Sequence, residues 1–149
     1  MDRISRVRYY LEVAKSVALR STCLISKYGC VVVKNDAIIS TGYNGAARGA
    51  KNCIDVGICI RDFEGFSRYN GCRAIHSEAN ALLHAKYSDL IGSTAYIARI
   101  DTTKSSHAII EPCKNCKRLL INAQVSKVIC LQEDKSIKEY KVVDWIETI

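Results

Sequence analysis

Hydrophobic residues near the start of the chain recur at spacings of three and four, which is the period of an amphipathic helix. They predict a helix over residues 3–19. Two strand-forming runs follow, residues 30–33 and 37–41, on either side of the polar segment 34–36. Two such runs around a short polar turn predict a β-hairpin.

Residues 42–70 show little periodicity and include five glycines, so this segment is predicted to be a long loop. A loop of this length within a compact domain usually carries function. The stretch 74–87 is rich in alanine and leucine, with apolar positions that define one buried face, and predicts a second helix.

The rest of the chain alternates between strand and helix signals. Strands are predicted at 93–98, 107–110 and 126–131, and a third helix is predicted to have Pro112 at its first position, where the missing N–H is tolerated. The order of these elements predicts a sheet with helices on its faces, an α/β arrangement in three layers. No repeat or linker divides the chain, so residues 1–149 are predicted to form a single domain.

The C-terminal tail contains five apolar or aromatic residues that are expected to cover an apolar surface, with Trp145 as the anchor. They are Tyr140, Val142, Val143, Trp145 and Ile146.

Composition narrows the class of protein. No apolar run reaches the roughly 18 residues of a bilayer span, and the N-terminus lacks the features of a secretory signal, so a cytoplasmic protein with no membrane partner is expected. Eight cysteines in such a chain favour metal binding or thiol chemistry over disulfides. The net charge of +7 suits an anionic partner. A basic and aromatic stretch that could stack bases is absent from the sequence, which makes nucleic acid the less favoured partner.

Two short motifs carry the candidate chemistry. His76-Ser77-Glu78 starts the predicted second helix, and Pro112-Cys113-Lys114-Asn115-Cys116 starts the third. This pairing of H-x-E with P-C-x-x-C is the signature of zinc-dependent nucleobase deaminases. Cysteines three positions apart face the same side of a helix, so Cys113 and Cys116 can share a metal ion with His76.

Three protein ligands leave one position of a tetrahedral zinc ion free for water, and water bound there ionises near pH 7. Glu78 is expected to act as the catalytic acid and base, taking the proton of this water, passing it to the ring nitrogen and later protonating the leaving amine. A zinc-stabilised binding module without catalysis is the competing hypothesis. A carboxylate beside the metal that is not needed as a ligand argues against that hypothesis.

With these motifs, the chain resembles the deoxycytidylate deaminase family of the cytidine deaminase-like superfamily. The matching segments are 27–29, 40–45, 48–49, 52–53, 72–73, 76–81, 112–116 and Val128. The resemblance implies a three-layer α/β/α fold with a central mixed sheet and assembly into a homo-oligomer. It also implies that Asn44 hydrogen-bonds the sugar or phosphate of the substrate, and that the backbone N–H of Ser77 holds the pyrimidine carbonyl. Two features depart from the family: Ser77 replaces the usual alanine, and residues 99–111 make a longer excursion.

The remaining cysteines divide into two groups. Cys23, Cys53, Cys59 and Cys72 occur in irregular segments, and four such thiols suit a closed structural zinc site. The resemblance supports Cys23 and Cys53 as ligands of a second zinc. Reduced, half-buried thiols are the alternative. Cys30 and Cys130 lie within apolar strands and are predicted to be small core residues.

Other polar residues near the motifs are weaker candidates. His84 and His107 are expected to be ordinary surface or hydrogen-bonded histidines. Arg48, Lys51 and Arg73 flank the expected pocket and are candidates for holding a substrate phosphate, although a solvated charge is the commoner state.

The motifs predict a zinc-dependent hydrolase, and the family resemblance implies that it converts a small-molecule nucleotide, dCMP, and water into dUMP and ammonia. The alternatives are a deaminase of cytosine or adenine within nucleic acid, and an enzyme acting on a modified cytosine nucleotide, a triphosphate or a nucleoside.

Overall fold

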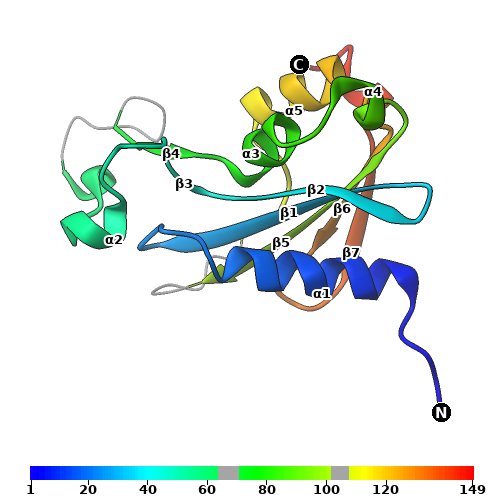
Figure 1. Cartoon of the computed structure of the whole chain (residues 1–149), viewed down its shortest axis with the longest axis horizontal. Coiled ribbons are helices and arrows are strands. Elements are labelled where there is room, and N and C mark those ends of the chain that lie inside the picture. The colour runs from blue at the N-terminus through cyan, green and yellow to red at the C-terminus, as the bar shows by residue number, and fades with distance from the viewer. Residues whose placement is uncertain (64–70, 102–107) are drawn as a thin grey trace.

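The computed structural model describes residues 1–63, 71–101 and 108–149. Within them, the chain forms a five-stranded sheet in the order β2-β1-β5-β6-β7 (Figure 1). Its strands are β1 (Ser26–Lys34), β2 (Ala37–Tyr43), β5 (Thr94–Asp101), β6 (Lys127–Leu131) and β7 (Ile137–Lys141). β5 and β6 are parallel and the other neighbours are antiparallel. The sheet is therefore mixed, as predicted.

Helices cover both faces of the sheet and give three layers (Figure 1). Helix α1 (Arg6–Ala18) packs on one face against β1 and β5, where its residues Leu11 and Ala14 are buried. The opposite face carries α3 (Ser77–Leu83), α4 (Tyr87–Leu90) and α5 (Lys114–Asn122). Apolar side chains fill both interfaces, so the predicted α/β/α arrangement is confirmed.

The first two predicted elements are correct. Helix α1 begins after Ser5, whose side chain accepts a hydrogen bond from the N–H of Arg8 and so caps the helix. β1 and β2 form the predicted hairpin. Its turn residues Asn35 and Asp36 have φ values of 51° and 59°, which is the left-handed conformation that a tight hairpin turn requires.

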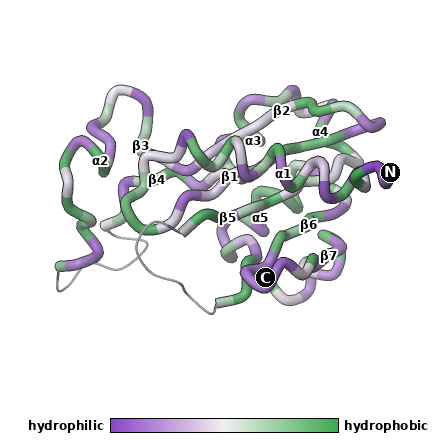
Figure 2. The backbone as a smooth tube through the Cα atoms, turned by 90° about the horizontal axis from the view of Figure 1, so that it is seen from below, coloured by the Kyte–Doolittle hydropathy of each residue, from purple (hydrophilic) through white to green (hydrophobic). Residues whose placement is uncertain are grey.

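The predicted long loop contains short elements of its own. β3 (Gly45–Ala46), α2 (Cys53–Val56) and the 3-10 helix η1 (Ile60–Asp62) follow β2, and residues 64–70 lie outside the described chain. Figures 1 and 2 show α2 beyond the end of the sheet, far from β7. The segment that contains α2 therefore lies next to the start of β1 (Figure 1).

The predicted helix over 74–87 is wrong in its bounds. β4 (Ala74–Ile75) pairs with β3, so the helical turn starts only at Ser77, and the helix ends at Leu83 before the separate helix α4. The alanine-rich composition extends into β4, but a strand partner distant in sequence takes its hydrogen bonds. His76 is consequently the residue immediately before α3.

Two predictions around the third helix are also wrong. Residues 108–110 do not form a strand, because the side chain of Gln132 takes the place of a neighbouring strand: it donates to the carbonyl oxygen of Ile110 at 2.9 Å and accepts from its N–H at 2.8 Å. Residue 107 lies outside the described chain. Pro112 precedes the N-cap of α5, which is Cys113, and is not the first helical residue.

The C-terminal tail forms β7 and the 3-10 helix η2 (Val142–Trp145). Trp145 is buried in the core, as predicted, and the ammonium of Lys117 lies 5.1 Å from its ring centre. Val143 and Ile146, expected to cover an apolar surface, are instead mostly exposed. In the parts of the chain that the structure describes, no helix is long and apolar enough to cross a membrane.

Candidate active site

His76, Cys113 and Cys116 converge between the starts of α3 and α5. Their ligand atoms all lie within 4.8 Å of one another, and the Nδ1 of His76 is 3.4 Å from each of the two sulfurs. A tetrahedral zinc ion with ordinary Zn–N and Zn–S bonds separates nitrogen from sulfur by about 3.6 Å. The three side chains thus fit a zinc ion closely, and a soft pair of thiolates with one imidazole is a donor set that zinc prefers.

The backbone fixes these ligands in place. β4 delivers His76 to the N-cap position of α3, while Cys113 is the N-cap of α5 and Cys116 lies one turn later. Helix α3 approaches β2 very closely at Gly42: a Cβ there would lie 2.3 Å from the amide nitrogen of Ala81. Glycine therefore sets the distance between the sheet and the helix that positions His76.

The pKa values of the two thiols are shifted in opposite directions. The hydrogen bond from Cys116 lowers the pKa of Cys113 to about 3, although burial opposes this, and His76 adds to the lowering. The pKa of Cys116 is raised because it donates to Cys113 and is buried. A divalent cation at this place favours ionisation of both thiols.

Glu78 lies next to this cluster and is almost completely buried, with 6% of its surface exposed. Burial raises the pKa of its carboxyl group, whereas its own backbone N–H, the charge of His76 and the Ser77 hydroxyl lower it. The hydroxyl of Ser77, itself fully buried, donates to Oε2 of Glu78 at 3.1 Å. A buried carboxyl group with a raised pKa beside potential metal ligands is suited to act as a general acid and base.

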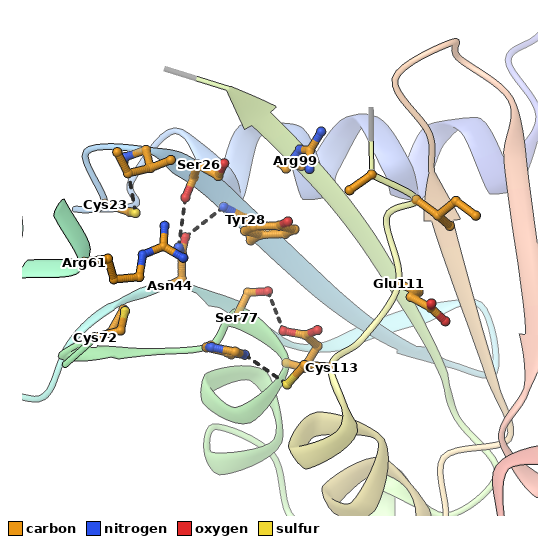
Figure 3. A pocket seen from close by; sticks show the side chains of 16 residues that line it. Cys23, Ser26, Tyr28, Asn44, Arg61, Cys72, Ser77, Arg99, Glu111 and Cys113 are labelled. Carbon is orange, nitrogen blue, oxygen red and sulfur yellow. Dashed lines mark hydrogen bonds between the residues drawn. The ribbon is translucent and has the colours of Figure 1, made fainter. Parts of the chain in front are cut away.

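A cavity of about 280 Å³ opens beside the cluster, where β1 begins and β5 ends (Figure 3). Its lining includes Tyr28, Asn44, Arg61, Ser77, Glu78 and Cys113. The predicted substrate-binding residues Asn44 and Ser77 therefore share one cavity with the predicted catalytic residue.

The side chain of Asn44 forms hydrogen bonds with neighbouring segments of the cavity wall. Its Oδ1 accepts from the N–H of Tyr28 at 2.8 Å and from the hydroxyl of Ser21 at 2.6 Å, and its Nδ2 donates to the carbonyl of Ser26 at 3.0 Å. The second N–H of this amide forms no hydrogen bond with the described residues. Ser21, which was not predicted from the sequence, is buried and holds the side chain of Asn44 in place through this hydrogen bond.

The charges around the cavity differ from the prediction. Arg48, Lys51 and Arg73 do not line it, and Arg73 instead donates to the backbone carbonyl of Lys51. Arg61 and Arg99 do line it. These two arginines were missed because only the folded chain brings η1 and the end of β5 to the same cavity.

The four cysteines predicted to hold a second zinc lie at the same end of the molecule but do not form a closed site. Cys23 and Cys72 line the cavity, and the charges of Cys23, Cys72 and Cys59 act on Cys53, whose pKa is raised by burial first and by these neighbours next. Among the described residues, the sulfurs of these four do not form a group of three within 4.8 Å.

The remaining candidates occupy ordinary positions. Cys30 and Cys130 are completely buried in the core, as predicted. Nδ1 of His84 lies 2.6 Å from the carbonyl oxygen of Thr41, so this histidine is hydrogen-bonded, while His107 lies outside the described residues.

Comparison with known proteins identifies the family. Residues 4–132 match the family described as the cytidine and deoxycytidylate deaminase zinc-binding region. The chain belongs to this family. This confirms the resemblance found in the sequence, and the chain is accordingly a hydrolytic deaminase.

Individual relatives agree. The deoxycytidylate deaminase of Mycobacterium phage D29 is 38% identical over 141 residues, which cover 89% of this chain and 99% of that protein. The deoxycytidylate deaminase of Saccharomyces cerevisiae is 34% identical over 137 residues, which cover 91% of this chain but 40% of the yeast protein.

Solved structures share the deaminase fold. The dCMP deaminase of cyanophage S-TIM5 in its apo form superposes with a TM-score of 0.60 at 22% identity, over 88% of this chain and 86% of that one. The cytidine deaminase of Burkholderia pseudomallei gives a TM-score of 0.63 at 15% identity, over 95% and 96% of the two chains.

Proposed function

We propose that this protein catalyses zinc-dependent hydrolytic deamination of dCMP to dUMP and ammonia. The observation that carries the proposal is the cluster of His76, Cys113 and Cys116 with a buried carboxylate, Glu78, at the wall of one cavity. When bound there, zinc lowers the pKa of a water ligand to about 7 and so supplies a nucleophile at neutral pH.

The protein's own groups handle the protons. Glu78 accepts the proton that water releases as oxygen bonds to C4 of cytosine, and donates it to N3 of the ring. As the C4–N bond breaks, the hydroxyl added to C4 becomes the carbonyl of the product, and its proton passes through Glu78 to the leaving amine, which departs as ammonia. Burial of Glu78 favours its protonated form, and the Ser77 hydroxyl and the His76 charge favour the ionised form. These opposing effects suit a group that must both accept and donate.

Ser77 and Asn44 are proposed to orient the substrate. The backbone N–H of Ser77, at the start of α3, is suited to donate to the pyrimidine carbonyl, because N–H groups of the first helical turn lack intrahelical acceptors. The second N–H of the Asn44 amide is suited to a sugar hydroxyl or phosphate oxygen.

The choice of dCMP rests on the relatives. The matched phage and yeast proteins are named deoxycytidylate deaminases, and a second structure of the S-TIM5 enzyme is described as a complex with dCMP and dUMP. The proposal is tested by measuring ammonia release from a panel of substrates: dCMP, dCTP, deoxycytidine, modified cytosine nucleotides, single-stranded DNA and RNA. We expect kcat/KM to be highest for dCMP. Preferred turnover of DNA or RNA, with a rate that falls steeply as salt rises, would instead indicate a nucleic-acid deaminase.

We also propose a second, structural zinc held by Cys23, Cys53, Cys59 and Cys72. Two observations support this proposal. The N–H of Ile25 donates to the sulfur of Cys23 at 3.4 Å, a contact that stabilises a thiolate. Burial raises the pKa of Cys53, and the charges of Cys23, Cys72 and Cys59 raise it further. Zinc analysis of the purified protein is expected to give two ions per chain, and one in Cys53→Ala. A single ion in both proteins would rule out the second site.

Finally, we propose assembly with copies of the same chain. Leu83 on α3 and Leu119 on α5 expose 74% and 47% of their surface on neighbouring helices. Sedimentation velocity is expected to show an oligomer that Leu83→Glu weakens. A wild-type monomer at micromolar concentration would contradict this.

A further inference from the structure

Among the residues that the structure describes, the charged side chains lining the cavity are those of Arg61, Glu78, Arg99 and Glu111. Arg99 forms an ion pair with Glu133, and its side chain is 5% exposed. Glu111 accepts from the ammonium of Lys117 at 3.0 Å. Of the four, Glu78 is the group placed beside the metal ligands. Arg61 is the remaining charged group, and its contacts differ from those of the other three.

Arg61 belongs to η1 and is half-buried. Within the described chain, no carboxylate lies within 4.0 Å of its guanidinium, which hydrogen-bonds the sulfur of Cys59. This contact holds one edge of the guanidinium against Cys59. A guanidinium has five N–H donors, so the bond to Cys59 leaves donors that can face the cavity.

Arg61 also lies on the side of the cavity away from the metal ligands, where it can contact the far end of a nucleotide (Figure 3). In Figure 3, Arg61 and Cys113 lie on opposite sides of Ser77, and the guanidinium of Arg61 points toward the side of the cavity that Asn44 occupies. Deamination requires the cytosine ring next to Glu78 and the metal ligands. A ring at that end directs the sugar toward Asn44, and the group attached to the sugar lies further along, toward Arg61.

We propose that Arg61 binds the 5′-phosphate of the substrate and so makes the cavity selective for a nucleoside monophosphate over a nucleoside. This inference rests on the proposed deaminase function. A guanidinium matches the geometry of phosphate oxygens with paired N–H donors, and its charge complements a dianion. Because Arg61 has no carboxylate partner among the described residues, phosphate can bind to it without breaking an existing ion pair.

The test compares wild type with Arg61→Gln, which keeps hydrogen-bonding ability but removes the charge, and Arg61→Lys, which keeps the charge. Steady-state ammonia release is measured with dCMP and with deoxycytidine. Hydrogen bonds to charged groups contribute about 10- to 100-fold in affinity. We expect Arg61→Gln to lower kcat/KM for dCMP by about this factor, chiefly through KM, and to change that for deoxycytidine less than about threefold. Arg61→Lys is expected to recover part of the loss.

Arg48→Gln is the matched control, because Arg48 is exposed and outside the cavity lining. It removes the same charge from the protein and is expected to leave both substrates unaffected. An unchanged kcat/KM for dCMP in Arg61→Gln, or an equal fall with both substrates, would overturn the assignment.

A binding measurement separates this inference from the proposed function. Isothermal titration with dUMP, which needs no turnover, is expected to show binding to wild type and at least about tenfold weaker binding to Arg61→Gln. Absence of dCMP turnover by wild type would contradict the proposed function, whereas equal dUMP affinity of the two proteins would contradict the role of Arg61.

Discussion

Replacing Gly42 with alanine should damage the active site from a distance. Gly42 lies in β2 under α3, and its Cβ would lie 2.3 Å from the N of Ala81 and 2.4 Å from the carbonyl oxygen of Ser77. Backbone atoms at this distance cannot yield as a side chain does. To restore ordinary contact, α3 and β2 must separate by about 1 Å, and overpacking of this kind destabilises a protein by about 1–3 kcal/mol.

The separation would also move His76 and Glu78 away from Cys113, which lies on another helix. Misplacement of catalytic groups by 1 Å can lower a rate by about 100-fold. We therefore expect Gly42→Ala to lower kcat by about this factor under conditions where it is still folded, together with weaker zinc retention. Urea unfolding followed by circular dichroism gives the stability, and ammonia release with zinc analysis gives the site.

Gly29→Ala is the matched control. Gly29 lies in β1 on the opposite face, where a Cβ would lie 2.0 Å from the carbonyl oxygen of Ala14 and 2.6 Å from the N of Ala18. This variant should lose similar stability by displacing α1, which carries no residue of the site, and keep kcat within about threefold. The reasoning would be refuted if Gly42→Ala kept wild-type kcat and zinc while losing stability, or if both variants lost activity equally.

Three further substitutions test other contacts. Ser77→Ala removes the hydrogen bond to Glu78 and should lower kcat about tenfold, with zinc content and KM nearly unchanged; a change confined to KM would contradict a positioning role. Cys113→Ala should lose one zinc ion per chain and all measurable turnover, and full zinc content would remove Cys113 from the ligand set. Tyr10→Phe removes a 2.6 Å hydrogen bond to Asp36 and should cost about 1 kcal/mol. That bond raises the pKa of Tyr10 to about 12, so the stability difference should persist below pH 10 and disappear between pH 10 and 12 in urea titrations; a difference independent of pH would contradict this.

The features that could be predicted from sequence have local causes. The apolar spacing of α1 reflects a helix with one face on the sheet, and the polar turn at Asn35 and Asp36 is set by residues adjacent in the chain. The H-x-E and P-C-x-x-C motifs are equally local, because each places its side chains within one helical turn. The folded chain brings the two motifs to the same place, as their pairing predicts.

Features that depend on distant partners could not be predicted. Pairing of β4 with β3 shortens the helix that the alanine-rich sequence favours, and the side chain of Gln132 replaces a strand beside Ile110. The cavity charges are a similar case. Arg61 comes from a segment without periodicity, and Arg99 lies at the end of a strand, so their common location depends on the tertiary fold.

The most direct test of the central claim is the turnover of Glu78→Gln in its zinc-loaded form. Glutamine preserves the shape of the side chain but cannot carry protons between water, ring nitrogen and amine. With the zinc content of both proteins matched, we predict that this variant binds dUMP like wild type and releases ammonia from dCMP at least about 1,000-fold more slowly. Turnover within about tenfold of wild type at equal zinc content would contradict the assigned role of Glu78.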